Sequence, residues 1–360
     1  MGRPKEFYRG KRRYRWIITA LLFLAAVLVI LAAWLFYYMQ QFVVYDKDGA
    51  HIRFDSSETS ADTSSASDAA AVGSVDTEIV VDAPDYSEVY TGAGENLDNI
   101  RALYVRAEGV SAANLNYYAS SAASGGANAL LVQLKAEDGQ LMWLSGLPLA
   151  VSYGLDGTEE LAASFASAGE SLWLAAEIST LTDYGMATRN LPLALKNASL
   201  AAITDGACAW LDPYNDEVRE YYSTLMTQLA DMGFDEIVVS GLYLPAAEGI
   251  VYSEEMTATP ENSAAVSSFA LWLRSEADEL GLRLSARCET EALRGGTSAE
   301  LGQRLELFWA VFDRIYIETT PDYFASDVQA LEAALGGSDG ARIVPIEATG
   351  TPSTESWAVG

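Results

Sequence analysis

Residues 129–135 read ALLVQLK, and residues 236–240 read EIVVS. Both are near-continuous apolar runs, the pattern of strands covered on both faces in a parallel sheet. Around them, strand-like segments alternate with helix-like ones. The eight strand candidates are residues 102–107, 129–135, 172–178, 207–211, 236–240, 282–288, 314–318 and 342–347. This number and alternation predict an α/β fold, a (β/α)8 TIM-type barrel.

The segments between these strands carry the signals of helices. Helices are expected over residues 111–124, 159–169, 215–232, 261–280, 298–310 and 326–335. An open doubly wound sheet is the alternative architecture, but it would normally have a glycine-rich first turn. Ala107, Glu108 and Gly109 follow the first strand and do not form that fingerprint. We therefore place a barrel domain at residues 97–350, followed by a C-terminal tail at 351–360.

The N-terminal region has the signals of a membrane anchor. Residues 1–15 carry seven basic side chains, and residues 16–39 read WIITALLFLAAVLVILAAWLFYYM, without a charge. A helix of this length can cross a hydrocarbon core, and the basic flank places the N-terminus in the cytoplasm. A cleaved signal peptide is the alternative, but its apolar run is usually shorter. We predict a single-pass cell-membrane protein with its barrel outside the cell.

The region between the predicted span and the barrel has no capacity for a core. After a juxtamembrane segment at 40–54, residues 55–86 read DSSETSADTSSASDAAAVGSVDTEIVVDAPDY. Ser, Thr, Ala and Asp dominate, and Lys and Arg do not occur there. Such a composition predicts a flexible, self-repelling and disordered linker, which we place at 55–96.

Composition excludes several functional classes. The chain has 22 Lys and Arg against 50 Asp and Glu, a formal charge of −28, which disfavours nucleic acid as a partner. His51 is the single histidine and lies outside the predicted barrel, so a Ser-His-Asp or Cys-His mechanism there is excluded. Carboxylate chemistry, a hard metal held by carboxylates, or no chemistry remain, and we expect neither a cofactor nor a metal. A Cys208–Cys288 disulfide is left open.

In a barrel of this type, functional groups lie where strands end and loops begin. At the predicted strand ends, the glutamates expected to provide an acid and a base for glycoside hydrolysis are Glu108, Glu177 and Glu318. The residues expected to bind substrate are Lys135, Trp143, Trp210, Asp212, Tyr243 and Glu289. The aromatic members could stack on sugars, although Trp143 and Trp210 could equally pack in the core.

Two stretches resemble a known family. Residues 210–245 read WLDPYNDEVREYYSTLMTQLADMGFDEIVVSGLYLP, and residues 128–139 read NALLVQLKAEDG. Their W-L-D-P-Y, G-F-D-E-I and N-A-apolar-K blocks resemble a bacterial family of glycoside hydrolase domains, which are membrane-anchored or secreted alpha-amylase-like barrels. The resemblance implies a polysaccharide partner at the cell envelope. Asp212, Asp235, Glu236 and Lys135 match that pattern.

The departures from the family pattern affect catalysis. Gln133 and Ser240 stand where the pattern has strand-end aspartates, Tyr243 stands at an arginine position, and Glu177 stands where the third strand usually has an arginine. An amide cannot exchange a catalytic proton as a carboxyl group does. Two hypotheses follow. Either the acid and base have moved to glutamates such as Glu108, Glu177 or Glu318, or the domain is a non-catalytic glycan-binding or scaffold module.

Overall fold

The structure is a computed structural model that describes residues 43–46, 49–52, 98–253, 259–320, 322–335, 342–347 and 356–360. The chain divides into two compact units, Met1–Ile79 and Val80–Gly360. The predicted membrane span at 16–39 and the predicted linker at 55–96 lie outside the described residues. Among the residues that are described, no helix is long and apolar enough to cross a membrane.

The first unit contains one described hairpin. Strands β1 (Val43–Asp46) and β2 (Gly49–Ile52) pair antiparallel, with Asp46 opposite Gly49. His51 belongs to this hairpin and pairs with Val44. The single histidine is therefore part of the first unit and not of the barrel.

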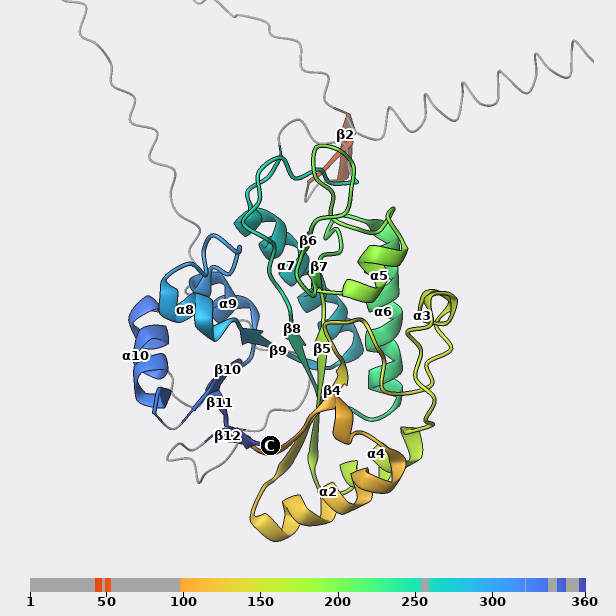
Figure 1. Ribbon diagram of the computed structural model, residues 1–360, viewed down its shortest axis with the longest axis vertical. Helices are drawn as coiled ribbons and strands as arrows, with labels where there is room; N and C mark the ends of the chain where they lie inside the picture. The colour runs from red at the N-terminus through yellow and green to blue at the C-terminus, as the bar shows by residue number, and fades with distance from the viewer. Residues whose placement is uncertain are drawn as a thin grey trace, which may run out of the picture. The chain divides into compact units, whose positions relative to one another are not determined.

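The second unit is a closed barrel of eight strands in the order β10-β11-β12-β3-β4-β5-β8-β9, and every neighbouring pair is parallel. This confirms the predicted barrel. The strands are β3 (Arg101–Val105), β4 (Ala129–Lys135), β5 (Trp173–Ser179), β8 (Glu236–Ser240), β9 (Arg283–Cys288), β10 (Ile315–Thr319), β11 (Ile343–Glu347) and β12 (Trp357–Val359). Figure 1 shows the strands in the middle of the domain, with helices around them.

One predicted strand is wrong. Residues 207–211 do not enter the barrel: Cys208–Ala209 (β7) instead pairs antiparallel with Thr204–Asp205 (β6) in a separate two-stranded sheet. The remaining place is taken by β12, which lies within residues 351–360, the predicted C-terminal tail. β12 pairs with β11 on one side and with β3 on the other, so it joins the first and last parts of the domain.

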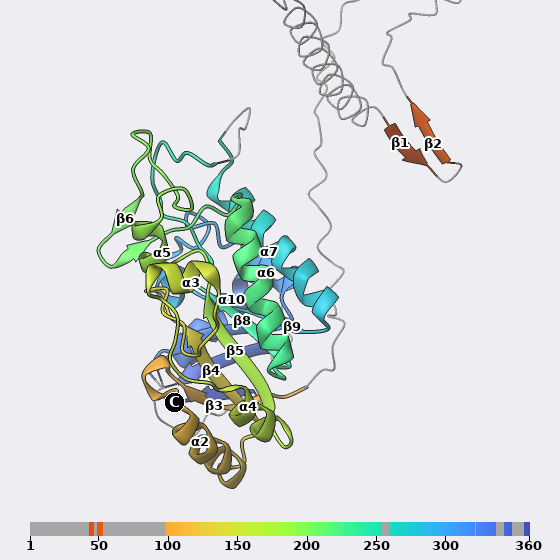
Figure 2. The same cartoon turned by 90° about the vertical axis from the view of Figure 1, so that its right-hand side faces the viewer.

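The helices follow the predicted alternation and lie outside the strands (Figures 1 and 2). They are α2 (Ala112–Gly125), α3 (Pro148–Tyr153), α4 (Ala162–Gly169), α5 (Tyr184–Arg189), α6 (Asp216–Asp231), α7 (Asn262–Leu280), α8 (Thr290–Gly295), α9 (Leu305–Val311) and α10 (Phe324–Leu335), with a 3-10 turn η1 at Ala107–Gly109. In α6, the Asn215 side chain caps the first turn by accepting hydrogen bonds from the Glu217 and Val218 amides.

Burial explains why the apolar runs form barrel strands. All five residues of β8 are buried, because helices cover the outside of the barrel and side chains fill its inside. At one end of the interior, the carboxylate of Glu236 accepts hydrogen bonds from Ser285, Arg314 and Trp173. Asp235 accepts a hydrogen bond from the Leu174 amide. These two acids of the family-like block therefore serve the structure of the barrel.

Candidate functional site

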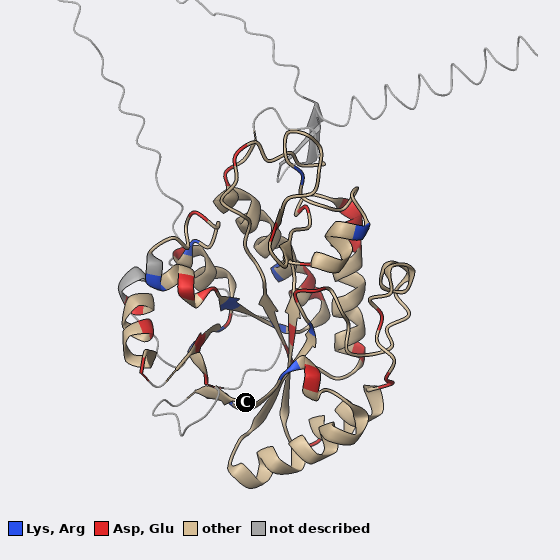
Figure 3. Ribbon diagram, viewed as in Figure 1, with Lys and Arg blue, Asp and Glu red and all other residues tan. Residues whose placement is uncertain are grey.

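A pocket of about 670 Å³ lies where β9 and β10 end. Its floor and walls come from these strand ends, from α8 and from the loop after β8. The lining residues are Tyr243, Arg287, Cys288, Glu289, Thr290, Glu291, Ala292, Arg294, Thr297, Leu301, Glu318, Thr319 and Thr320. This is the carboxyl end of the barrel, where TIM-barrel enzymes hold their active sites. Figure 3 shows acidic and basic segments side by side around these strands.

Arg287 occupies the centre of the charged groups in this region. Its Nη1 atom lies 2.8 Å from Oε1 of Glu177, and its Nη2 atom is paired with Oε2 of Glu318. Arg106, just after β3, adds a second ion pair to Glu318, with 2.9 Å between Nη2 and Oε1. The result is a chain of alternating charges, Glu177–Arg287–Glu318–Arg106, that crosses the end of the barrel.

Glu289 behaves differently from the acids in that chain. Burial raises its pKa to about 7, Arg287 opposes the rise, and the negative charges of Glu137, Glu318 and Glu177 add to it. None of the described residues forms an ion pair with the Glu289 carboxyl group, whereas its backbone amide is fixed by a 3.1 Å hydrogen bond to Oε1 of Gln303. Glu289 therefore keeps a proton up to near-neutral pH and can donate it.

Glu318 stays ionised beside this protonated acid. Burial alone would raise its pKa, but the hydrogen bond from Arg106 and the charges of Arg287 and Arg106 outweigh burial and lower it. One pocket thus holds two carboxyl groups whose pKa values are shifted in opposite directions. This division between a proton donor and an ionised carboxylate is the usual arrangement in glycoside hydrolysis.

Both oxygens of Glu318 accept a hydrogen bond from an arginine, Oε1 from Arg106 and Oε2 from Arg287. A carboxylate held in this way is fixed in position and weakened as a nucleophile, because its lone pairs are already shared. In this arrangement Glu318 can stabilise positive charge on a nearby group. To attack a sugar carbon it would have to give up one arginine.

Glu177 lies deeper than the sequence suggested. Its side chain is fully buried inside the barrel, where Oε1 is paired with Arg287 and Oε2 has no hydrogen-bond partner among the described residues. Burial and the nearby charge of Glu177 raise the pKa of Tyr104. Glu177 is not among the residues that line the pocket. It therefore holds Arg287 from inside the barrel.

Gln133 and Ser240, which stand at the two aspartate positions of the family pattern, make contacts within the barrel. Oε1 of Gln133 accepts a hydrogen bond from the Ala107 amide at 3.2 Å and so fixes the turn after β3. Ser240 is buried, and its carbonyl accepts hydrogen bonds from the amide and the hydroxyl of Thr180. The Gln133 side chain and the Ser240 backbone therefore contribute to the barrel framework. The carboxyl group nearest in sequence that lines this pocket is Glu289, after β9.

Tyr243 reaches the pocket by way of a glycine turn. Gly241 has a φ of +58°, and a Cβ atom there would lie 2.5 Å from the hydroxyl oxygens of Ser179 and Thr182. Only glycine fits this turn, which directs the chain from β8 toward Tyr243. The Tyr243 ring packs edge-on against Trp210, with 6.0 Å between centroids. Trp210 is itself buried, so Tyr243 alone of this pair is presented to the pocket.

The structure places the other predicted site residues away from the pocket. The buried Lys135 ammonium lies 2.8 Å from Oδ2 of Asp183 and donates a hydrogen bond to the Ser179 carbonyl. Asp212 is buried and accepts hydrogen bonds from the Tyr214 and Ser253 amides, so it fixes a loop.

The last two predicted residues also have other surroundings. Trp143 is 3% exposed, and its indole N–H donates to Gln228 on α6, which places its ring in the packing between a loop and that helix. Glu108 is exposed in η1, and it is not among the residues that line the pocket. Of the nine predicted residues, the pocket brings together Glu289, Glu318 and Tyr243.

Sequence reasoning missed the arginines of the site. Arg287 was hidden within the predicted strand LRLSARC, and Arg106 lies at the end of ALYVRA. Their signal was their rarity: beyond residue 39 the chain has few bases, and a base in an otherwise apolar strand needs a buried acid. Arg294 of α8 was missed too, and its two nitrogens lie 2.7 Å and 2.6 Å from the carboxylate oxygens of Asp327.

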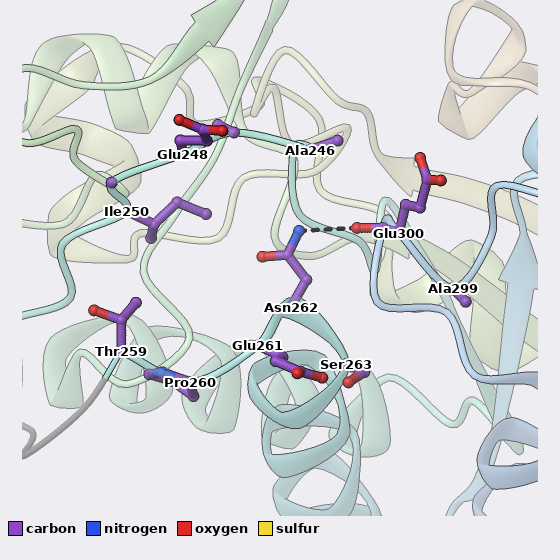
Figure 4. A pocket seen from close by; sticks show the side chains of 12 residues that line it. Ala246, Glu248, Ile250, Thr259, Pro260, Glu261, Asn262, Ser263, Ala299 and Glu300 are labelled. Atoms are coloured by element: carbon purple, nitrogen blue, oxygen red, sulfur yellow. Dashed lines mark hydrogen bonds between the residues drawn. The ribbon is translucent and has the colours of Figure 1, made fainter.

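A second pocket, of about 430 Å³, lies between the loop after β8 and the start of α7 (Figure 4). Asn262 crosses it and donates hydrogen bonds to the Pro245 and Glu300 carbonyls, at 2.9 Å and 3.0 Å. The described residues that line it include neither an aromatic ring nor a basic side chain. The pocket beside Glu289 therefore has more of the groups that a sugar needs.

Carboxylate clusters and thiols are the other groups in the described part of the chain that could carry chemistry. No group of three or more His, Cys, Asp or Glu side chains there is arranged to hold a metal ion. Cys208 and Cys288 are free thiols, which settles the disulfide question in this structure. Cys288 is buried in the pocket wall, and burial raises its pKa, so its thiol stays protonated.

Comparison with known families identifies the family of the barrel domain. Residues 102–335 match the family described as "Putative glycosyl hydrolase domain". The chain belongs to this family. The match spans β3 to α10 and includes Arg287, Glu289 and Glu318. No curated protein matches the chain.

Several solved structures are similar to the chain. A hypothetical protein from Ruminiclostridium thermocellum ATCC 27405 has 23% identity and a TM-score of 0.44, over 51% of this chain and 96% of that one. The GH20 beta-N-acetylhexosaminidase from Streptomyces coelicolor A3(2) has 13% identity and a TM-score of 0.45, over 69% of this chain and 48% of that one.

The glycoside hydrolase domain of a PelA variant from Pseudomonas aeruginosa has 12% identity and a TM-score of 0.39, over 68% of this chain and 83% of that one. The chain spans about half the length of the hexosaminidase that it matches.

Proposed function

We propose that this protein is a membrane-anchored extracellular glycoside hydrolase that acts on polysaccharide at the cell envelope, with Glu289 as the proton donor and Glu318 as the ionised carboxylate. Membership of the glycosyl hydrolase family supports a carbohydrate-related function. The anchor rests on the charge-free run at 16–39 and its basic flank. The observation that carries the catalytic assignment is the pair of carboxyl groups, one protonated and one ionised, in one pocket.

The charges of the pocket favour an uncharged glycan. Arg287 is paired with Glu177 and Glu318, and Arg294 is paired with Asp327. The lining arginines are therefore already neutralised, while Glu291 adds a negative charge to the wall. A uronic acid or sulfated sugar would enter without a cation to bind it and would be repelled. Neutral polysaccharides are the proposed substrates.

The test is release of reducing sugar by the purified full chain, in mild detergent, from a panel of neutral polysaccharides. Glu289→Gln keeps the shape of the side chain and removes its proton, so activity should fall by about 100-fold or more. Activity should also decline as the pH rises above about 7, where Glu289 loses its proton. The matched control, Glu108→Gln, changes an exposed glutamate outside the pocket and should retain activity. Full activity of Glu289→Gln would remove Glu289 from the mechanism.

A non-catalytic glycan-binding module is the second candidate. The arginine hydrogen bonds to both Glu318 oxygens favour it, as does the loss of both strand-end aspartates to Gln133 and Ser240. This candidate predicts measurable affinity for a neutral glycan without release of reducing sugar. Wild-type turnover that depends on Glu289 would exclude it.

A further inference from the structure

Tyr323 is an exposed aromatic residue at the edge of the pocket beside Glu289. It precedes α10 and follows the end of β10, the strand that carries Glu318. Its amide donates a 3.0 Å hydrogen bond to the carbonyl of Thr320, which lines the pocket. Its side chain is 53% exposed. A tyrosine this exposed contributes little to the core, and its ring is accessible to a ligand.

One face of the Tyr323 ring is covered by a fixed cation. The guanidinium carbon of Arg294 lies 4.7 Å from the ring centroid. Arg294 cannot easily move away, because Asp327 holds it through two hydrogen bonds. Asp327 is fully buried and also accepts a hydrogen bond from Thr319, at 2.6 Å. The pocket wall therefore supports the ring from behind and fixes its orientation.

The exposed part of this ring suits an uncharged sugar. The C–H groups on one face of a pyranose carry a small positive charge and stack on the negative face of an aromatic ring. A second cation would be a poor occupant, because Arg294 already uses the ring as a cation–π partner and would repel it. A loose surface side chain would lose conformational entropy on binding, whereas the Arg294–Asp327 support reduces that cost.

We propose that Tyr323 forms a separate sugar-binding subsite, on which a neutral pyranose unit stacks while the neighbouring part of the same glycan chain occupies the pocket beside Glu289. The proposal rests on the glycan-binding part of the proposed function and holds with or without catalysis. The ligand is then an oligosaccharide that fills the pocket and extends beyond it to Tyr323. A disaccharide that fills only the pocket does not use Tyr323.

The experiment measures binding by isothermal titration calorimetry, with the full chain in mild detergent and the dimers and hexamers of xylo-, manno-, cello- and chito-oligosaccharides. The wild-type chain should bind the hexamer of one series more tightly than its dimer. Tyr323→Ala should weaken hexamer binding by about tenfold and leave dimer binding unchanged. Tyr323→Phe keeps the ring and should retain the wild-type affinity for the hexamer.

Tyr117→Ala is the matched control, because Tyr117 is another exposed tyrosine, 68% exposed on α2 and outside the pocket lining. It should leave both affinities unchanged. Thermal unfolding shows whether each variant is folded, and Tyr323→Phe tests the ring independently of Tyr323→Ala. Wild-type hexamer binding with equal affinity in Tyr323→Ala would overturn the subsite while leaving the proposed function intact. If the wild-type chain bound none of these glycans, the proposed function and the subsite would both fail.

Discussion

Removing the ionisable group of Glu289 should change how the stability of the protein depends on pH. In the folded chain the pKa of Glu289 is about 7, against an ordinary value of 4.5. The folded state thus holds a proton that the unfolded state releases between these two pH values. Linkage then requires the wild-type free energy of unfolding to fall as the pH rises through this range.

The size of the effect follows from the shift. A pKa raised from 4.5 to about 7 corresponds to about 3 kcal/mol, most of which would be expressed by pH 8. In Glu289→Gln the side chain at this position is neutral at every pH, so the free energy of unfolding does not fall for this reason. The variant should therefore gain up to about 3 kcal/mol of stability relative to wild type between about pH 4 and pH 8.

The assay is urea unfolding of the full chain in mild detergent, followed by tryptophan fluorescence at several pH values. Glu108→Gln removes the same charge from an exposed side chain, and any pH-dependent difference that it shows is subtracted as an effect of net charge. A constant difference between wild type and Glu289→Gln across the pH range would refute the raised pKa of Glu289. Glu289 would then be ionised near neutral pH and could not act as a proton donor.

Three further perturbations test the ion pairs and the barrel closure. Arg287→Met should destabilise the chain by about 3–5 kcal/mol in urea unfolding, because it leaves buried Glu177 without its cation. Arg287→Lys keeps the positive charge and should lose less stability. If both variants lost the same free energy of unfolding, the ion pair with Glu177 would be contradicted. Asp183→Asn should cost a similar amount, about 3–5 kcal/mol in urea unfolding, because buried Lys135 keeps its hydrogen bond to the Ser179 carbonyl but loses its counter-ion; an unchanged free energy of unfolding would contradict this. Deleting residues 356–360 removes β12 and should abolish cooperative unfolding, measured by calorimetry; a normal transition would show that the barrel closes without it.

The sequence predicted seven of the eight barrel strands, because buried parallel strands are continuous apolar runs with glycine or polar residues at their ends. It failed at residues 207–211 because ACAWL is apolar for another reason: Trp210 and Leu211 pack in the loop that covers the barrel end. It missed β12 because three residues, Trp357–Val359, are too short to show a periodic pattern.

For the site, the local sequence identified acids at strand ends, but it could not show which of them line the pocket. Glu177 and Glu289 look alike in sequence, yet one is paired inside the barrel and the other has a raised pKa in the pocket. Both properties come from tertiary contacts, because Arg287 pairs with Glu177 across 110 positions of the chain and burial raises the pKa of Glu289. Tyr323 could not be found either, because its support comes from Arg294, a residue of a different helix.

The pairing of β12 with β3 also affects the order in which this protein can fold during synthesis. The Ile100 amide donates a hydrogen bond to the Ser356 hydroxyl, a contact that spans 256 positions. Until residues 356–359 have been made, β3 and β11 each present an unpaired edge at this seam, and open parallel edges favour association with other chains. The nascent domain must therefore remain open, and needs protection from aggregation, for almost the whole time that it takes to make the barrel.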